Sequence, residues 1–146
     1  MIFVMVLAAR PTSAQKKGKK QRYQQSIRDA AMSRVGSAKT PLLDGELYAR
    51  IVYFHAIKTE LDVDNIPKPI LDALIGIVYD DDHRIAQCLT TRVHAQGDYT
   101  TTDNHVFPDI HKIIKNLVKE GKKHVLYIEV GPISSYHIGF GPIEGG

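Results

Sequence analysis

Apolar and polar residues follow two different periods along this chain, and the two periods predict different elements. Four segments are rich in branched and aromatic residues, which is typical of β-strands. These predicted strands are 2–7, 46–57, 85–95 and 125–130. In three other segments apolar residues recur every three or four positions, which is the period of one face of an α-helix. These predicted helices are 23–34, 67–75 and 109–120, each followed by a glycine expected to end it, Gly36, Gly76 and Gly121.

This set of elements predicts an α+β fold. A chain of 146 residues is long enough for one domain with a real core and too short for two ordinary domains. We expect a mixed β-sheet of about four strands with two to three helices packed on it, within residues 1–130. Residues 131–146 contain five glycines and two prolines and are predicted to form a loose tail.

The composition, 43% hydrophobic and 24% charged, is typical of a soluble globular protein. Cys88 is the single cysteine, which excludes a disulfide framework and favours a reducing compartment. The apolar residues 1–9 lack a basic leader and are too short to span a bilayer, so no membrane association is expected. We therefore expect a cytoplasmic protein.

Charge is distributed unevenly. Residues 10–39 carry nine basic side chains against one acid, whereas residues 58–82 carry seven acids against two lysines. A basic segment beside an acidic one suits a polyanion held by the first and a metal ion held by the second. Residues 15–20 are too charged to pack and are expected to be exposed before the first helix. The candidate contacts to a DNA backbone here are Arg10, Lys16, Lys17, Lys19, Lys20 and Arg22.

The acids from Leu61 to Ile85 are interleaved with apolar residues, so the fold is expected to direct them to one place. Asp62 and Asp64 are two apart and would share one face of an extended backbone. Asn65 and Pro67 are a predicted helix cap and first-turn residue. Lys68 and Asp72, four apart, then share one side of the helix, and the acids Asp80, Asp81 and Asp82 follow it.

Such a cluster needs a counter-charge. Like charges about 4 Å apart repel by roughly 4 kcal/mol at an effective dielectric near 20. A divalent cation offsets this repulsion, and all-oxygen ligands suit Mg²⁺, with Mn²⁺ as a substitute. Metal held by two carboxylates and a third from a nearby turn stabilises the attacking water and the leaving oxygen of a phosphodiester. Lys68 is placed to contact the scissile phosphate.

The run Asp62-x-Asp64-Asn65-x-x-Lys68-x-x-x-Asp72-Ala73-Leu74, followed by Asp81-Asp82, resembles the signature of the RusA family of Holliday-junction resolvases. The resemblance is expected to extend over residues 2–130. By position it implies four catalytic residues, Asp62, Asp64, Asp82 and Lys68. It implies metal binding by the three aspartates together with Asp81, and supporting roles for Asp72 and Asn65.

The same resemblance implies a Mg²⁺-dependent endodeoxyribonuclease that resolves four-way DNA junctions by paired symmetric nicks. It implies a homodimer, which agrees with the need for two cuts in opposed strands. His83 and Arg84 depart from the family pattern, which has a small residue and a glutamine there. Arg84 is expected to pair with a neighbouring aspartate or with DNA, His83 to be exposed, and Asp80 to be a solvated turn residue.

Three other functions can be compared with the sequence. A phosphatase with an Asp-x-Asp nucleophile needs a second lysine and a distant acidic motif, neither of which is evident. A calcium-binding loop needs alternating oxygen ligands and a glycine, which the segment after Asp62 lacks. A protein that binds junctions or other branched DNA with weak or lost nuclease activity remains the alternative, although every matched acid and Lys68 are retained.

Overall fold

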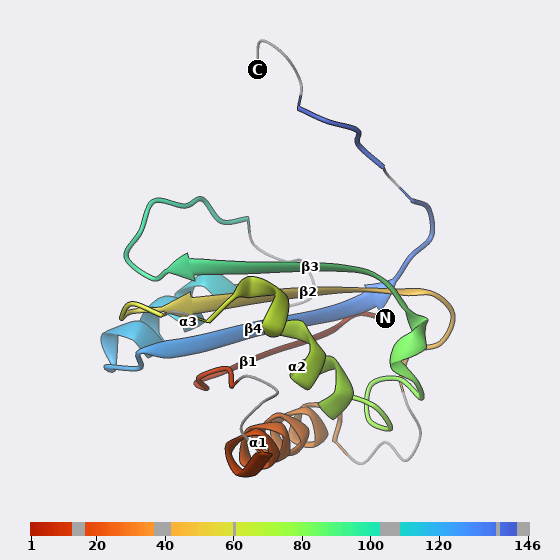
Figure 1. The fold of residues 1–146 in the computed structure, drawn as a ribbon, viewed down its shortest axis with the longest axis horizontal. Coiled ribbons are helices and arrows are strands. Elements are labelled where there is room, and N and C mark those ends of the chain that lie inside the picture. The colour runs from red at the N-terminus through yellow and green to blue at the C-terminus, as the bar shows by residue number, and fades with distance from the viewer. Residues whose placement is uncertain (13–16, 37–41, 60, 103–108, 137, 143–146) are drawn as a thin grey trace.

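A four-stranded mixed sheet forms the centre of the structure, a computed structural model that describes residues 1–12, 17–36, 42–59, 61–102, 109–136 and 138–142 (Figure 1). The strands are β1 (Phe3–Leu7), β2 (Leu47–His55), β3 (Ile85–His94) and β4 (His124–Pro132). Their order is β1-β4-β2-β3. Strand β4 is antiparallel to β1 and β2, whereas β3 lies parallel to β2 at the edge. The four predicted strands and the α+β class are confirmed.

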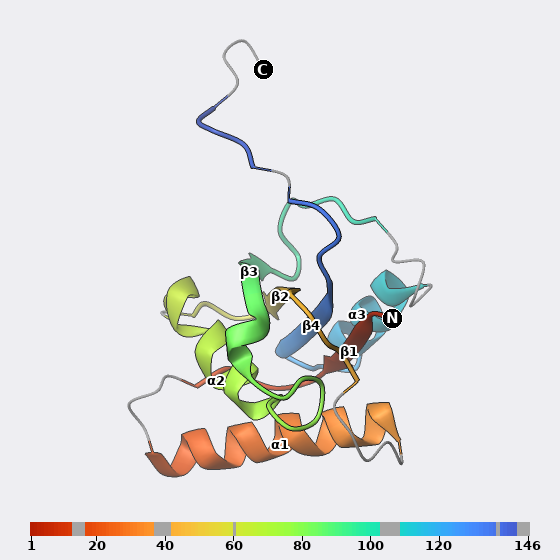
Figure 2. The ribbon, with the colours of Figure 1, turned by 90° about the vertical axis from the view of Figure 1, so that its right-hand side faces the viewer.

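Helices cover both faces of the sheet. The three helices are α1 (Lys17–Val35), α2 (Pro67–Ala73) and α3 (Ile110–Lys119). Helices α1 and α2 pack on one face and α3 packs on the other, as the two ribbon views show (Figures 1 and 2). Two short 3-10 turns, η1 (Val63–Asn65) and η2 (Asp82–Arg84), precede α2 and β3. The chain thus runs β2–η1–α2–η2–β3, the crossover that two parallel strands require.

The two cores follow from the alternation of side chains along β2. Leu47, Ala49, Ile51 and Tyr53 point to the larger core beneath α1 and α2 and are buried. Phe54, on the other face, joins the smaller core with residues of α3. This alternation is the reason that β2 can be buried on both faces at the middle of the sheet.

Helix α1 holds α2 by side-chain hydrogen bonds as well as by packing. Gln24 Nε2 donates to the Pro69 carbonyl at 3.0 Å. Arg28 Nη1 donates to the carbonyls of Ala73 and Ile75, at 3.0 and 3.2 Å, and so satisfies acceptors at the end of α2. Arg28 is half-buried, because the end of α2 supplies acceptors that its guanidinium can reach.

The first helix also begins earlier than predicted. Residues 17–20, expected to be an exposed segment outside any element, form its first turn. Lysine is a good helix former, and the buried residues Tyr23, Ile27 and Ala31 of the same helix supply the packing that stabilises it. Lys16 lies outside the described residues. At the other end of the chain, β4 runs two residues further than expected, to Pro132.

No helix among the described residues is long and apolar enough to cross a membrane. The residues from 138 to 142 extend away from the body of the molecule (Figure 1).

Gly131 gives a test of the sheet register. It pairs with Tyr48, and a Cβ added at Gly131 would lie 2.8 Å from a ring carbon of Tyr48. We predict that Gly131→Ala lowers the free energy of unfolding by about 1–3 kcal/mol, because the tyrosine ring must move. The measurement is urea denaturation. The control is Gly139→Ala, which meets no atom within 4 Å and should leave stability unchanged. Equal stability of the two variants would contradict the register.

Candidate active site

The segment that carries Asp62 and Asp64 is a tight turn. Asp62 has extended backbone angles, and the next three residues form η1, closed by a hydrogen bond from the Asn65 amide to the Asp62 carbonyl at 3.1 Å. The prediction of an extended backbone through both aspartates is therefore wrong. A 3-10 helix has three residues per turn, so positions two apart do not share a face. Both aspartate side chains are exposed.

The start of α2 also differs from the prediction. Ile66 is the residue before the helix, and no side chain caps it. Asn65 cannot serve as the cap because it belongs to η1 and has left the extended conformation that a cap requires. Pro67 is at the first helical position, as expected. The turn and the proline together fix how α2 begins and so where Lys68 lies.

Lys68 joins two acids from different elements. Its Nζ lies 2.9 Å from Asp72 Oδ1, one turn along α2, and 3.0 Å from Asp82 Oδ2, in η2. Two carboxylates thus share one ammonium group. The side chains of Asp72 and Asp82 are about one-third exposed, at 30% and 31%, and that of Lys68 is 69% exposed. The arrangement is open to solvent and to a large substrate.

Lys68 and the carboxylates beside it shift one another's pKa. The hydrogen bond from Lys68 is the main cause that lowers the pKa of Asp82. The hydrogen bonds to Asp72 and then to Asp82 raise the pKa of Lys68. Asp82 therefore stays ionised and Lys68 stays protonated over the whole physiological range.

The turn that carries Asp82 is fixed from both sides. Asp81 Oδ1 accepts the His83 amide at 2.9 Å and so caps η2. Before it, the buried Tyr79 donates its hydroxyl to the Leu71 carbonyl of α2 at 2.7 Å. The helix that carries Lys68 and the turn that carries Asp82 are thereby held to one another through the core. His83 is exposed, as predicted.

Arg84 pairs with acids. Its Nη1 lies 2.8 Å from Asp44 Oδ1, and its Nη2 donates to Asp80 Oδ2 at 3.0 Å while Nε binds the other oxygen of the same carboxylate. Asp80 is thus one half of a bidentate ion pair as well as a turn residue. The pair lowers the pKa of Asp80 and raises that of Arg84. Of the two partners expected for Arg84, the structure supplies the neighbouring aspartate.

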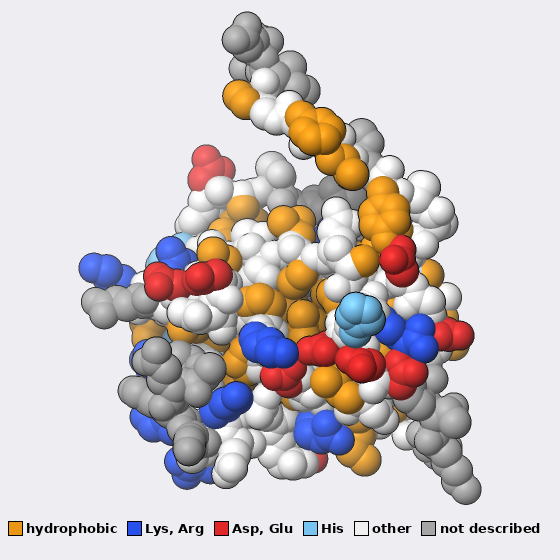
Figure 3. Space-filling view, turned by 45° about the vertical axis from the view of Figure 1, so that its right-hand side comes forward, with side chains coloured by type: hydrophobic (Ala, Val, Ile, Leu, Met, Phe, Trp, Pro, Cys, Tyr) orange, Lys and Arg blue, Asp and Glu red, His pale blue; other side chains and the backbone are white. Residues whose placement is uncertain are grey.

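The structure thus brings together part of the predicted set. Asp72, Asp82 and Lys68 meet, with Asp81 beside Asp82. Asp62 directly precedes η1 and Asp64 lies within it, so both come before Lys68 in the chain. Figure 3 shows acidic side chains gathered in a row across one face of the molecule, with basic side chains next to them. Among the described residues, no three His, Cys, Asp or Glu side chains are arranged as a metal site.

The chemistry of these residues nevertheless fits a divalent cation. The exposed donors are carboxylate oxygens, which Mg²⁺ and Mn²⁺ prefer. Two of them already hold a cationic group, the Lys68 ammonium, between them. With Asp81 next to Asp82, three carboxylates surround the single positive charge of Lys68, so the local charge is negative and attracts a cation.

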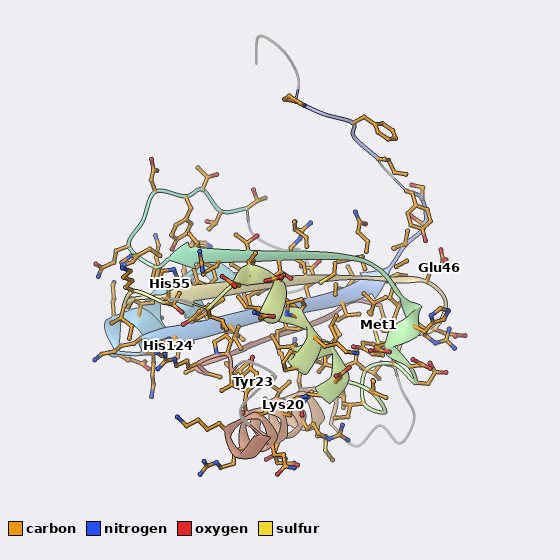
Figure 4. All side chains as sticks on the ribbon, in the orientation of Figure 1. Met1, Lys20, Tyr23, Glu46, His55 and His124 are labelled. Atoms are coloured by element: carbon orange, nitrogen blue, oxygen red, sulfur yellow. The ribbon has the colours of Figure 1, made fainter. Side chains whose placement is uncertain are left out.

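Most of the predicted DNA contacts lie on α1 or close to it. Lys19 and Arg22 are exposed on α1, and Arg10, after β1, is exposed as well. Lys20 is half-buried and extends from the same helix (Figure 4). Lys17 is the first residue of α1.

Three residues of this region were not predicted to act in it. Asp44 pairs with Arg84 across 40 positions of sequence, and Tyr79 binds α2 from within an apolar run. Arg92 of β3 donates to the carbonyl of Leu61, directly before Asp62. No spacing in the sequence reveals such contacts, because each depends on how the crossover folds over the sheet.

Comparison with known families gives one match. The family model described as Endodeoxyribonuclease RusA matches residues 6–107, which is well over half of the chain. The match includes the last two residues of β1 and the whole of α1, β2, α2 and β3, and with them every predicted site residue. It ends before α3 and β4, short of residue 130, to which the resemblance was expected to extend. No curated protein matches the sequence.

The shared ammonium predicts a titration shift. In Lys68→Met, we expect the pKa of Asp82 to rise, because its main stabilising partner is gone. A lowered pKa contributes stability at neutral pH that is lost as the pH falls through the lowered value. In the variant the pKa of Asp82 lies closer to its unfolded-state value, so this contribution is smaller and is lost at a higher pH. The measurement is the carbon-13 shift of the carboxyl groups against pH. Asp80, held by Arg84, is the internal control, and an unmoved Asp82 would contradict the geometry.

Proposed function

The chain belongs to the RusA family of endodeoxyribonucleases, and from this premise we propose that it resolves four-way DNA junctions by Mg²⁺-dependent hydrolysis of phosphodiester bonds. Two opposed strands are nicked symmetrically, in the course of DNA recombination and repair. The observation that carries the proposal is the Lys68 ammonium shared by Asp72 and Asp82. This contact supports a site in which residues from both parts of the motif, Lys68 and Asp72 from the first and Asp82 from the second, lie close together.

Asp62, Asp64 and Asp82, with Asp81 beside the last, are the proposed metal ligands. These carboxylates would hold Mg²⁺, which would supply activation of a water and neutralisation of the charge that develops on the phosphate. The donors suit the ion because all are carboxylate oxygens, and Asp82 is held ionised by Lys68. Asp72 and Asn65 are supporting residues, the first by holding Lys68.

Lys68 is the proposed stabiliser of negative charge on the scissile phosphate. Its ammonium is exposed and remains protonated, since both neighbouring acids raise its pKa. A cation one turn from the start of α2 can donate to a non-bridging oxygen of the scissile phosphate. Charge that develops in the transition state is then stabilised by a donor already in place.

The basic side chains of α1 and of the preceding segment are proposed to hold the phosphate backbone of the junction arms. They are Arg10, Lys16, Lys17, Lys19, Lys20 and Arg22. Arg84 is proposed to add a contact at the other side of the acids, where its guanidinium also pairs with Asp44 and Asp80. These contacts are independent of base sequence and set the affinity through counterion release.

A homodimer is part of the proposal. One protomer carries one copy of the motif, and symmetric resolution requires two cuts in opposed strands. A pair of protomers related by a two-fold axis supplies two active sites in the matching orientation.

The proposal predicts separate effects on cleavage and binding. Asp64→Asn removes a charged metal ligand and is expected to abolish Mg²⁺-dependent cleavage of a synthetic four-way junction, while junction affinity falls less than threefold. Gel assays of cleavage and of binding in EDTA measure the two. The control is Asp98→Asn, an exposed acid in the turn after β3. Cleavage by the Asp64 variant at the wild-type rate would remove Asp64 from the site. A wild-type protein that binds junctions without cutting them would favour the alternative, a branched-DNA binding protein.

The basic segment predicts a change in salt dependence. Replacing Lys16, Lys17, Lys19 and Lys20 with glutamine should weaken junction binding and flatten the plot of log affinity against log salt. The slope is expected to change by up to about 0.9 for each phosphate that the variant no longer neutralises. The matched control replaces Lys112, Lys115, Lys119 and Lys122, which lie in or next to α3 on the opposite side of the sheet. A slope for the first variant equal to those of the wild type and the control would show that the first set does not bind DNA phosphates.

A further inference from the structure

Leu61, the residue directly before Asp62, is bound through both of its backbone polar groups. Its amide donates to Thr59 Oγ1 at 3.2 Å. Its carbonyl accepts a hydrogen bond from Nη1 of Arg92, in β3. A residue outside helix and strand that is held at both its N–H and its C=O has little freedom. The position of the following aspartate is restricted accordingly.

The contact on the amide side continues into the sheet. Thr59 lies close enough to the hydroxyl of Tyr53, a fully buried residue of β2, to oppose the rise in the pKa of that hydroxyl that burial causes. That hydroxyl lies 2.6 Å from Nδ1 of His124, at the start of β4. Burial, and after it the nearby Arg10, lowers the pKa of His124, so its ring is neutral. In the neutral ring, Nδ1 can accept a hydrogen bond from the Tyr53 hydroxyl. The series therefore runs from the Leu61 amide through Thr59 and Tyr53 to His124.

The contact on the carbonyl side comes from the neighbouring strand. Arg92 pairs with Tyr53 in the ladder between β2 and β3, so both side chains leave the same face of the sheet. That face is the one covered by α1 and α2. His124 pairs with His55 in the ladder between β2 and β4, and Figure 4 shows both at the end of the sheet away from Glu46. Three adjacent strands thus hold one residue of the crossover.

Strand β3 connects the contact between Arg92 and Leu61 to the turn that carries Asp82. It begins directly after η2, which contains Asp82, and it carries Arg92 near its far end. The ladder between β3 and β2 runs along the whole length of β2. A paired strand is stiff, so the Arg92 bond fixes the Asp62 segment relative to the turn that holds Asp82. The helix α2 makes the first connection between the two halves, and Arg92 makes a second.

We propose that Arg92, together with the Thr59–Tyr53–His124 series, positions Asp62 and Asp64 for metal binding by holding Leu61. We call this group the Leu61 anchor. The inference rests on the proposed role of the two aspartates as metal ligands. Arg92 is a positioning residue here, since it acts on the backbone and touches no proposed ligand. Partners that orient metal ligands typically contribute about 10- to 100-fold in metal affinity.

The test measures metal affinity apart from catalysis. Mn²⁺ binding to the full-length protein, alone and with an uncleavable four-way junction, is followed by calorimetry. Arg92→Met is expected to raise the Mn²⁺ Kd about tenfold or more, while the melting temperature in EDTA changes little, because Arg92 is exposed. Arg92→Lys keeps one donor and the charge and should recover part of the affinity. Thr59→Val, which breaks the amide side of the Leu61 anchor, should weaken Mn²⁺ binding in the same direction.

The control is Lys115→Met, which removes an exposed charge from α3 on the other face of the sheet. Unchanged Mn²⁺ affinity in both Arg92→Met and Thr59→Val would overturn the proposal. So would a decrease confined to junction affinity in EDTA with a flatter salt dependence, since Arg92 would then bind a phosphate. Junction cleavage by the wild-type protein distinguishes this failure from failure of the proposed function. If the wild-type protein cuts junctions and Arg92→Met binds Mn²⁺ normally, only the proposed role of the Leu61 anchor is refuted. A wild-type protein that neither cuts nor binds Mn²⁺ refutes both.

Discussion

Repulsion between carboxylates is the constraint that shapes this molecule around its crossover. Asp72 and Asp82 come from a helix and a turn that the core holds close together, so their carboxylates would repel each other unless a positive charge lay between them. The Lys68 ammonium supplies that charge at 2.9 and 3.0 Å. An exposed ion pair contributes little stability by itself. Its importance is local, because it sets the protonation and the position of the acids together.

The rest of the fold holds those acids in place by buried hydrogen bonds, by packing and by the ion pairs of Arg84. Tyr79 binds α2 to the acidic turn through a buried hydrogen bond, and Arg28 of α1 binds the end of the same helix. Arg84 forms ion pairs with Asp80 and with Asp44, so the charge of Asp80 is balanced by a partner other than Lys68. The sheet beneath provides a stiff frame, since β2 is paired on both sides. The acids are therefore exposed side chains on a well-packed support, which suits a site that must receive a bulky DNA junction.

Much of this arrangement could be predicted from sequence, since it depends on local periodicity. The strands, the helix ends at Gly36 and Gly121 and the pairing of Lys68 with Asp72 all follow from spacing within one element. The backbone around Asp62 could not be predicted, because a 3-10 turn and an extended strand are both compatible with an Asp-x-Asp run. Arg28 and Arg92 were missed for a different reason. Their acceptors are backbone carbonyls 45 and 31 positions away, and a carbonyl leaves no mark in a sequence.

In the proposed function, Asp62 and Asp64, at and within η1, serve one metal site together with Asp82, in η2. The most direct measurement is the anomalous diffraction of Mn²⁺ in crystals of the protein bound to an uncleavable four-way junction. We expect an anomalous peak next to carboxylate oxygens of Asp62, Asp64 and Asp82. Saturating Mn²⁺ with no peak there, or a peak held by other residues, would contradict it.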